Sequence, residues 1–169
     1  MSEKNSDFPC YHLDTNYLIN YLTPLDKATD ECRQAQSIVN RLRNQEHQLR
    51  VSAFTVGEFV NVIVQKKDAT KNQNMLCTFY DLVRQGDFII RCVENSELSQ
   101  ISKMMDEIRA KDFVIHPADV IITSHSIVDQ TCCGLLTFEG DLANSSGIKE
   151  VLETHFPKRK FMIVDDPYR

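Results

Sequence analysis

The sequence has few residues that break regular structure, with five Gly and five Pro among 169 residues. Such a composition is not that of a low-complexity or collagen-like chain, and no apolar run approaches the roughly 18 residues of a membrane-spanning helix. The polar start, MSEKNSD, lacks the apolar core of a signal peptide. We therefore expect a single ordered domain over residues 1–169, located in the cytoplasm and not in a membrane.

The sequence also lacks an excess of basic charge. Its 19 Lys and Arg residues against 24 Asp and Glu residues give a formal net charge of −5. That balance argues against a module dedicated to binding nucleic acid through a basic surface. It does not exclude a nuclease, because a nuclease that holds metal ions must gather carboxylates in one place.

No cysteine stands at the C-x-x-C spacing of a zinc site or a redox motif. Most of the six cysteines fall in apolar periodic runs, which predicts buried free thiols of the kind found in a reducing cytoplasm. These residues are Cys10, Cys32, Cys77, Cys92, Cys132 and Cys133.

Short apolar runs alternate along the chain with longer runs of helical periodicity. We expect five strands, namely a run that ends at Asp14 and the segments 48–53, 88–93, 134–138 and 160–164, together with seven helices. Strands that alternate with helices predict parallel strands joined by right-handed crossovers. The predicted fold is therefore an α/β class, a three-layer α/β/α sandwich around a mostly parallel sheet.

Acidic residues recur where these predicted strands end or the following helices begin. In a parallel α/β fold the strand-to-helix turns meet at one edge of the sheet, where ligands bind. We therefore expect a group of carboxylates at this edge, formed by Asp14, Glu58, Glu139 and Asp141. Asp119 joins them if its helix begins at the same edge.

Each acid also has a plain structural explanation. Asp14 could cap the first helix, and Glu58 could close a capping box with Thr55. Asp119 could be a favourable charge at a helix amino end, and the last two acids could be ordinary turn residues. His116 is expected only to cap the helix that carries Asp119.

Taken together, the acids point to a metal site. Several carboxylates at one edge would raise one another's pKa and cost stability unless a cation compensates. Mg²⁺ and Mn²⁺ are hard cations that prefer oxygen ligands. Such ions activate water and stabilise the attacking and leaving oxygens of a displacement at phosphorus, so phosphodiester hydrolysis is the predicted chemistry.

Four short motifs carry a resemblance to a known family. They are LDTNYLINYL with Asp14, SAFTVGEFVNV with Glu58, HPADVIITSHSIV with Asp119, and LLTFEGDL with Thr137, Glu139 and Asp141. In this order and spacing the chain resembles the PIN-domain ribonucleases, and particularly the VapC-type toxins of prokaryotic toxin-antitoxin pairs. The motifs span nearly the whole chain.

The resemblance implies a nuclease that uses Mg²⁺ or Mn²⁺ to cleave single-stranded RNA, forms a homodimer and is inhibited by an antitoxin protein. Asp14 and Asp119 would be the principal metal ligands, and Glu58 would complete the site directly or through water. Glu139 and Asp141 would hold a second ion or orient the nucleophile. The remaining matched positions, Asn16 and Thr137, would supply hydrogen bonds.

The sequence departs from the family at the last motif, where an aspartate usually stands at the position of Glu139 and an aromatic residue at that of Leu142. Three alternatives therefore remain. The chain could be a stand-alone RNA-processing PIN protein or a PIN-like scaffold that binds RNA or protein without cleaving. It could also be a phosphatase with Asp14 as nucleophile, although Asn16 replaces the second acid that such enzymes carry.

Overall fold

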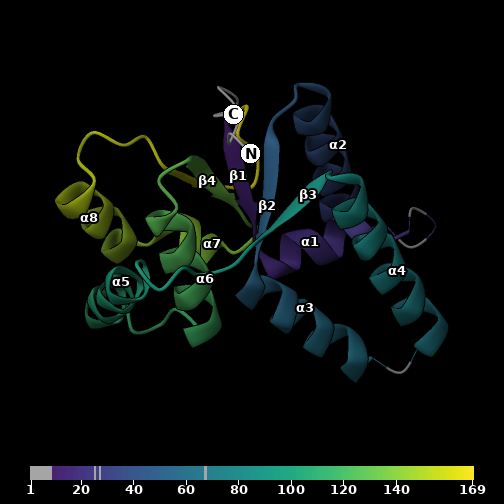
Figure 1. Ribbon diagram of the computed structural model, residues 1–169, viewed down its shortest axis with the longest axis horizontal. Helices are drawn as coiled ribbons and strands as arrows, with labels where there is room; N and C mark the ends of the chain where they lie inside the picture. The colour runs from purple at the N-terminus through teal and green to yellow at the C-terminus, as the bar shows by residue number, and fades with distance from the viewer. Residues whose placement is uncertain (1–8, 25, 27, 67) are drawn as a thin grey trace.

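A computed structural model describes residues 9–24, 26, 28–66 and 68–169 of the chain. At its centre is a sheet of five parallel strands in the order β3-β2-β1-β4-β5 (Figure 1). The expectation of a parallel α/β sheet is thereby confirmed. In chain order the strands are β1 (Cys10–Leu13), β2 (Gln48–Ser52), β3 (Phe88–Arg91), β4 (Cys132–Leu136) and β5 (Met162–Val164).

Eight helices surround the sheet in the part of the chain that the structure describes, one more than the sequence predicts. The additional helix is the short α7, which replaces the turn expected around Gly140. The helices are α1 (Thr15–Leu22), α2 (Asp30–Asn44), α3 (Ala53–Gln65), α4 (Ala69–Gln85), α5 (Leu98–Lys111), α6 (Pro117–Val128), α7 (Gly140–Asn144) and α8 (Ser146–His155). None of these helices has the length and apolar character needed to cross a membrane.

One face of the sheet is apolar and forms the larger core. Leu13, Val51 and Leu136 point to this face from the three central strands, and each is fully buried. They pack with apolar side chains of α1, α2, α3 and α4. Burial of one such side chain contributes about 1.5–3 kcal/mol, so this cluster accounts for much of the folding free energy.

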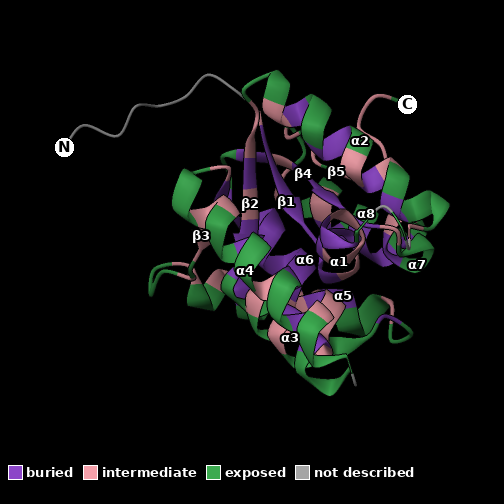
Figure 2. Cartoon of the chain, turned by 90° about the vertical axis from the view of Figure 1, so that its right-hand side faces the viewer, coloured by how far each residue is buried: buried purple, intermediate pink, exposed green. Residues whose placement is uncertain are grey.

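The opposite face of β1 is polar and faces α6. Side chains alternate along a strand, so Cys10 and His12 point away from the side that carries Leu13. The His12 ring lies 5.8 Å from the ring of His125 in α6. Although polar, β1 is buried along its whole length (Figure 2), and residues 122–128 of α6 are all buried. The α6 helix is thus an interior helix, joined through a second apolar cluster to α5 and α8.

The strand order creates a switch point between β1 and β4. The connections from β1 lead outward to β2 and β3, whereas β4 and β5 extend the sheet on the other side of β1. Open α/β sheets bind ligands in the crevice outside the carboxyl ends of such neighbouring strands. Here Asp14 follows β1 and Thr137 follows β4, so both residues stand at this crevice.

The cysteines differ from expectation. Cys10 and Cys132 are buried, but they form a disulfide between β1 and β4, where their backbones are directly paired. Cys32 is a buried free thiol as predicted, whereas Cys77 and Cys92 are exposed. Local periodicity did not reveal the pair, because it depends on the register of two strands that are 122 residues apart in the sequence.

Candidate active site at the carboxyl edge of the sheet

Asp14 is the innermost acid of the site. It is the N-cap of α1, and its Oδ1 accepts a 2.7 Å hydrogen bond from the backbone N–H of Thr15. The Thr137 hydroxyl donates to its Oδ2 at 2.8 Å. Burial, with smaller contributions from the charges of Asp119 and Glu58, raises its pKa to about 7 despite these two hydrogen bonds. The cap function and the site position therefore coincide in one residue.

Glu58 reaches the site from α3. The Thr15 hydroxyl donates to Glu58 Oε2 at 2.5 Å, which joins α3 to the start of α1. The capping box considered for Glu58 and Thr55 is absent among the described residues, since Ser52 caps α3 and accepts from the Thr55 backbone N–H. Glu58 is thus held beside Asp14 and takes no part in its own helix end.

Asp119 enters from the other side of the crevice, in the first turn of α6. The helix runs against the strand direction, because its last residue leads directly into β4, so its first turn lies at the carboxyl edge. His116 is its N-cap and accepts from the Ala118 backbone N–H, as predicted. Burial and the charges of Glu58 and Glu139 raise the pKa of Asp119 to about 6, although His116 opposes the shift.

Glu139 lies at the rim of the same crevice. The amide of Asn16 donates to Glu139 Oε1 at 2.7 Å, and the Glu139 backbone N–H donates to the Thr137 hydroxyl at 3.0 Å. Thr137 thus connects the end of β4 with Asp14, and Asn16 connects α1 with Glu139. Asp141 is exposed in the first turn of α7 and makes no hydrogen bond or ion pair with another described residue.

The acids of this crevice carry unbalanced charge. Among the residues that the structure describes, no Lys or Arg forms an ion pair with Asp14, Glu58, Asp119 or Glu139. Carboxylates that raise one another's pKa without a basic partner form the kind of donor set that a divalent cation stabilises.

The spacing of these acids suits an ion that keeps part of its water. In the described chain, three candidate ligand atoms within 4.8 Å of one another occur only in the group Cys10, Asp129 and Cys132, at the opposite edge of the sheet, so the acids at the carboxyl edge do not form such a compact group. Mg²⁺ takes one or two protein carboxylates directly and retains several waters, so the residues present fit such an ion.

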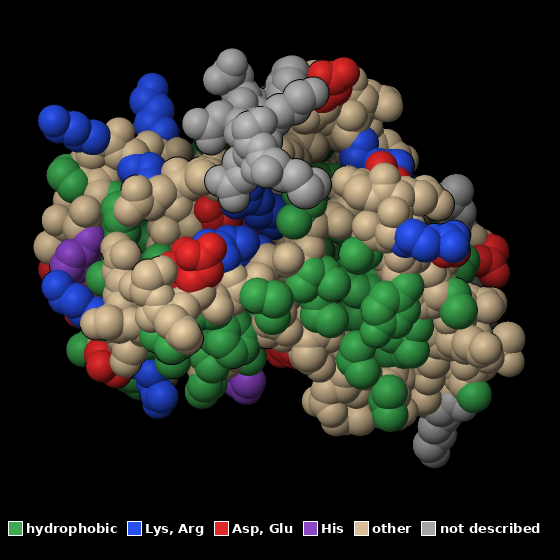
Figure 3. Space-filling view, viewed as in Figure 1, with side chains coloured by type: hydrophobic (Ala, Val, Ile, Leu, Met, Phe, Trp, Pro, Cys, Tyr) green, Lys and Arg blue, Asp and Glu red, His purple; other side chains and the backbone are tan. Residues whose placement is uncertain are grey.

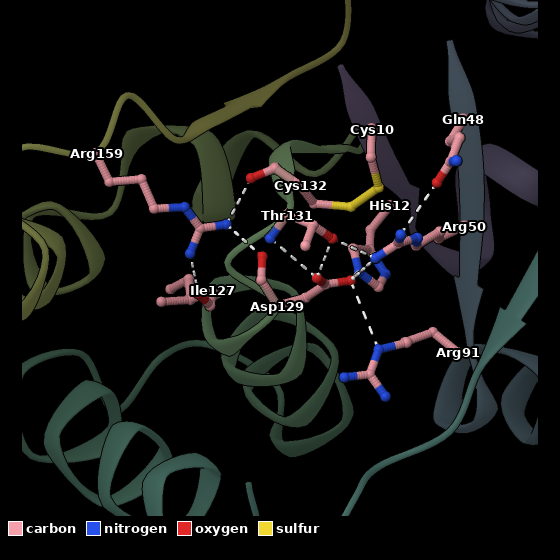
Figure 4. The surroundings of a disulfide bond; sticks show 10 residues. All are labelled: Cys10, His12, Gln48, Arg50, Arg91, Ile127, Asp129, Thr131, Cys132 and Arg159. Atoms are coloured by element: carbon pink, nitrogen blue, oxygen red, sulfur yellow. Dashed lines mark hydrogen bonds and ion pairs between the residues drawn. A yellow bond between two sulfur atoms is a disulfide. The ribbon is translucent and has the colours of Figure 1, made fainter. Parts of the chain in front are cut away.

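The amino edge of the sheet holds a second polar cluster, which the sequence reasoning missed (Figure 4). Asp129 Oδ2 accepts from His12 at 2.9 Å and from Arg50 at 2.6 Å, and its Oδ1 accepts from the Thr131 hydroxyl at 2.7 Å. Arg91 stands 3.8 Å away. Burial opposes ionisation, but these hydrogen bonds outweigh it and hold the pKa of Asp129 well below its usual range.

This second cluster does not form a convincing metal site. The Asp129 carboxylate is already engaged by three side chains, and the two neighbouring sulfurs are bonded to each other. Arg159 completes the region by donating to the backbone carbonyls of Ile127, Asp129 and Cys132. The cluster therefore ties strands and turn together, in contrast to the uncompensated acids at the other edge.

Comparison with solved structures identifies the fold. The chain matches a chain in the structure of VapBC2 from Rickettsia felis bound to a promoter DNA fragment, with 17% identity, a TM-score of 0.61, and coverage of 93% of this chain and 98% of that one. DNA-bound VapBC from Salmonella typhimurium matches with 13% identity, a TM-score of 0.58, and coverage of 92% and 98%. FitAcB from Neisseria gonorrhoeae matches with 15% identity, a TM-score of 0.54, and coverage of 94% of this chain and 99% of that one.

The chain has a PIN-domain fold.

At these identities the match concerns the fold, and comparisons with protein-family models and with curated proteins found no match. The fold accounts for the placement of the acids in this PIN domain. Asp14, Glu58, Asp119 and Glu139 converge because their segments all end or begin at the carboxyl edge. They come from four separate parts of the chain.

Proposed function

We propose that this PIN domain is a divalent-metal-dependent endoribonuclease that cleaves single-stranded RNA. The observation that carries the proposal is the coupling of Asp14, Glu58 and Asp119 across the switch point. Burial and mutual repulsion raise the pKa values of Asp14 and Asp119, and no described Lys or Arg balances the three charges through an ion pair. A domain retains such an arrangement at a cost in stability, which a bound cation offsets.

Mg²⁺ or Mn²⁺ is the proposed cofactor, held by Asp14 and Asp119, with Glu58 acting directly or through water. Asp141 is the proposed further metal ligand on the exposed side. When bound, the ion would activate water and stabilise the charge that develops on the phosphate oxygens. We assign the catalytic set to these four acids and Glu139.

The remaining side chains position the acids. The Thr137 hydroxyl and the Thr15 backbone N–H fix the two oxygens of Asp14, and the Thr15 hydroxyl orients Glu58. The Asn16 amide holds Glu139 toward the crevice from one side, so the longer side chain at this position still faces the other acids. The charge of Glu139 raises the pKa of Asp119, which supports a role for Glu139 in the catalytic set.

The proposal is tested with purified protein and end-labelled single-stranded RNA, first with Mn²⁺ and then with EDTA. Asp14→Asn keeps the size and capping ability of the side chain but removes the charge, so cleavage should fall at least about 100-fold, in line with the loss of a group that organises transition-state electrostatics. The matched control is Asp81→Asn, which removes an exposed acid on α4. It should leave cleavage unchanged.

Two outcomes would reject the nuclease. If RNA is cleaved equally by the wild type and Asp14→Asn, the cleavage does not come from this site. If RNA binds but stays intact with either metal, the domain is a scaffold that binds without cutting. A phosphatase would instead release phosphate from a small phosphomonoester and leave the RNA chain whole.

We further propose that the protein is the toxin of a toxin-antitoxin pair, is cytoplasmic and forms a homodimer. The VapBC and FitAB structures that share its fold support an antitoxin partner. An acid-lined crevice can also accept an Arg or Lys from an inhibitor.

Co-expression with the product of a small upstream reading frame should suppress growth arrest, and that product should co-purify with the protein. Absence of such a frame would favour a stand-alone RNA-processing enzyme, and sedimentation velocity would settle the dimer.

A further inference from the structure

The loop that joins α5 to α6 presents two large apolar side chains to solvent. Phe113 is 89% exposed and Val114 is 67% exposed. Phe113 has the highest exposed fraction among the large apolar side chains in the described part of the chain. Neither side chain is covered by the fold, and together the two form a small apolar tip that is available for contact with a ligand.

The two exposed residues sit on a fixed loop. On one side, Asp112 accepts a 2.7 Å hydrogen bond from the Ser145 hydroxyl. On the other side, Ile115 is 6% exposed and belongs to the apolar cluster of α5, α6 and α8. His116 then caps α6. The backbone on both sides of Phe113 is therefore anchored, and the ring is held out at a defined place.

That place is beside the crevice. The loop begins against Ser145, which directly follows α7, and ends at the helix that carries Asp119. His116 is close enough to Asp119 to affect its pKa, and the three residue-to-residue steps from Phe113 to His116 span at most about 11 Å. In Figure 3 a notch separates the lobe of α5, α6 and α8 from that of α3 and α4, and acidic side chains are visible at its inner end.

From this geometry we propose that Phe113 is an RNA-contact residue, which stacks on an unpaired nucleobase next to the phosphate that occupies the acidic crevice. The inference rests on the proposed ribonuclease function and assigns part of its substrate recognition. Single-stranded RNA is bound largely by bases that stack on aromatic side chains. The acids can engage only the backbone through a cation, so a separate group must hold the base.

A nucleobase fits the tip better than a protein surface does. A stable protein interface buries about 800 Å² on each partner, far more than two side chains on a loop offer. Of the other exposed large apolar side chains, Leu98 lies at the opposite end of α5 and Tyr80 on α4. Phe54 lies at the start of α3, where its ring packs edge-on against His125 of α6 and is 43% exposed, about half as much as Phe113. One ring matches one base in area, and each base has a π face.

The chain contains no Trp, which allows a direct measurement. Phe113→Trp, combined with Asp14→Asn to prevent cleavage, places a single Trp at the tip. Titration with a 12-nucleotide single-stranded RNA should quench its fluorescence. The matched control is Tyr80→Trp in the same background, since Tyr80 is an aromatic residue on α4 that is 55% exposed. Its fluorescence should not change.

Phe113→Ala should weaken RNA binding by about 5- to 150-fold, the range expected for the loss of one stacked base. In the cleaving enzyme it should raise KM by a similar factor and leave kcat nearly unchanged. Phe113→Tyr should restore wild-type binding, since a tyrosine ring stacks equally well.

Several results would overturn the assignment. One such result is an RNA affinity of Phe113→Ala within a factor of two of the wild type. Another is quenching of the Trp fluorescence of Tyr80→Trp equal to that of Phe113→Trp. A shift from dimer to monomer on Phe113→Ala would place the ring in a contact between copies of the chain. Failure of the ribonuclease proposal is seen separately, because the quenching assay uses a variant that does not cleave: quenching without cleavage by the wild type would retain the RNA contact and reject the nuclease.

Discussion

Replacing Asp14 with Asn should stabilise this protein in the absence of metal and at the same time lower the proposed RNA cleavage at least about 100-fold. In the folded protein the pKa of Asp14 is raised to about 7 from its ordinary value of 3.8, chiefly by burial. A raised pKa means that the folded state binds the proton more tightly than the unfolded state. The carboxyl therefore costs no stability below pH 3.8, and its cost grows as the pH rises toward about 7.

The size of the effect follows from this difference. A pKa of about 7 in place of 3.8 corresponds to about 4 kcal/mol at pH 8. Asn removes this cost but can lose one of the two hydrogen bonds that Asp14 accepts, worth about 1 kcal/mol. The expected net gain is about 3 kcal/mol at pH 8, or about 6 to 12 °C in Tm for a domain of this size. At pH 4 the gain should vanish.

The assay is thermal unfolding in EDTA at pH values from 4 to 8, followed by circular dichroism. The control Asp81→Asn, an exposed acid on α4, should show no such trend. Adding millimolar Mg²⁺ should stabilise the wild type by mass action and Asp14→Asn much less. The difference in Tm between the two proteins should therefore become smaller. If Asp14→Asn is as stable as the wild type or less stable at pH 8 in EDTA, then burial and repulsion do not raise the pKa of Asp14 enough to cost stability.

Four further changes test the surrounding framework. Asp129→Asn should lower the free energy of unfolding in urea by about 3 kcal/mol, because it leaves the largely buried Arg50 guanidinium without its charge partner; an unchanged urea midpoint would contradict the central place of Asp129. Reduction of the Cys10–Cys132 disulfide should lower the same quantity by up to about 5 kcal/mol, since the bond closes a loop across 122 residues, and a double Ser variant should be insensitive to reductant. Gly134→Ala should destabilise by about 1–3 kcal/mol, because its Cβ would stand 2.6 Å from a backbone oxygen of β5. Gly57→Ala, which meets nothing within 4 Å, should instead stabilise α3 by up to about 1 kcal/mol in the same denaturation experiment.

The parts that follow from local pattern were predictable. Alternation of short apolar runs with helical periodicity indicates the five parallel strands, and this topology predicts Asp14 and Glu58 at one edge, with Asp119 if its helix begins there. The capping function of His116 was also confirmed. Each of these inferences needs only residues close together in the sequence, together with the rule that parallel strands end at the same edge.

The parts that depend on strand register were not predictable. The pairing of Cys10 with Cys132 requires the alignment of β1 with β4, and nothing near either cysteine reveals it. The sequence analysis gave no role to Asp129, although polar His12 and Arg50 within otherwise apolar strands were a usable signal that a buried partner was needed. The capping box considered for Glu58 does not form because Ser52 is the N-cap of α3, and the Glu58 carboxylate instead accepts from Thr15 on another helix.

The site lies where two halves of the polypeptide meet. Asp14 and Glu58 belong to the half whose side chains form the larger apolar cluster, and Asp119 and Glu139 follow in the half that forms the second cluster. The larger cluster is completed by Leu136 of β4, so the first half does not close its core without the second. The full set of acids likewise comes together only once Glu139 has been added, so the crevice can form only when nearly the whole chain has been synthesised.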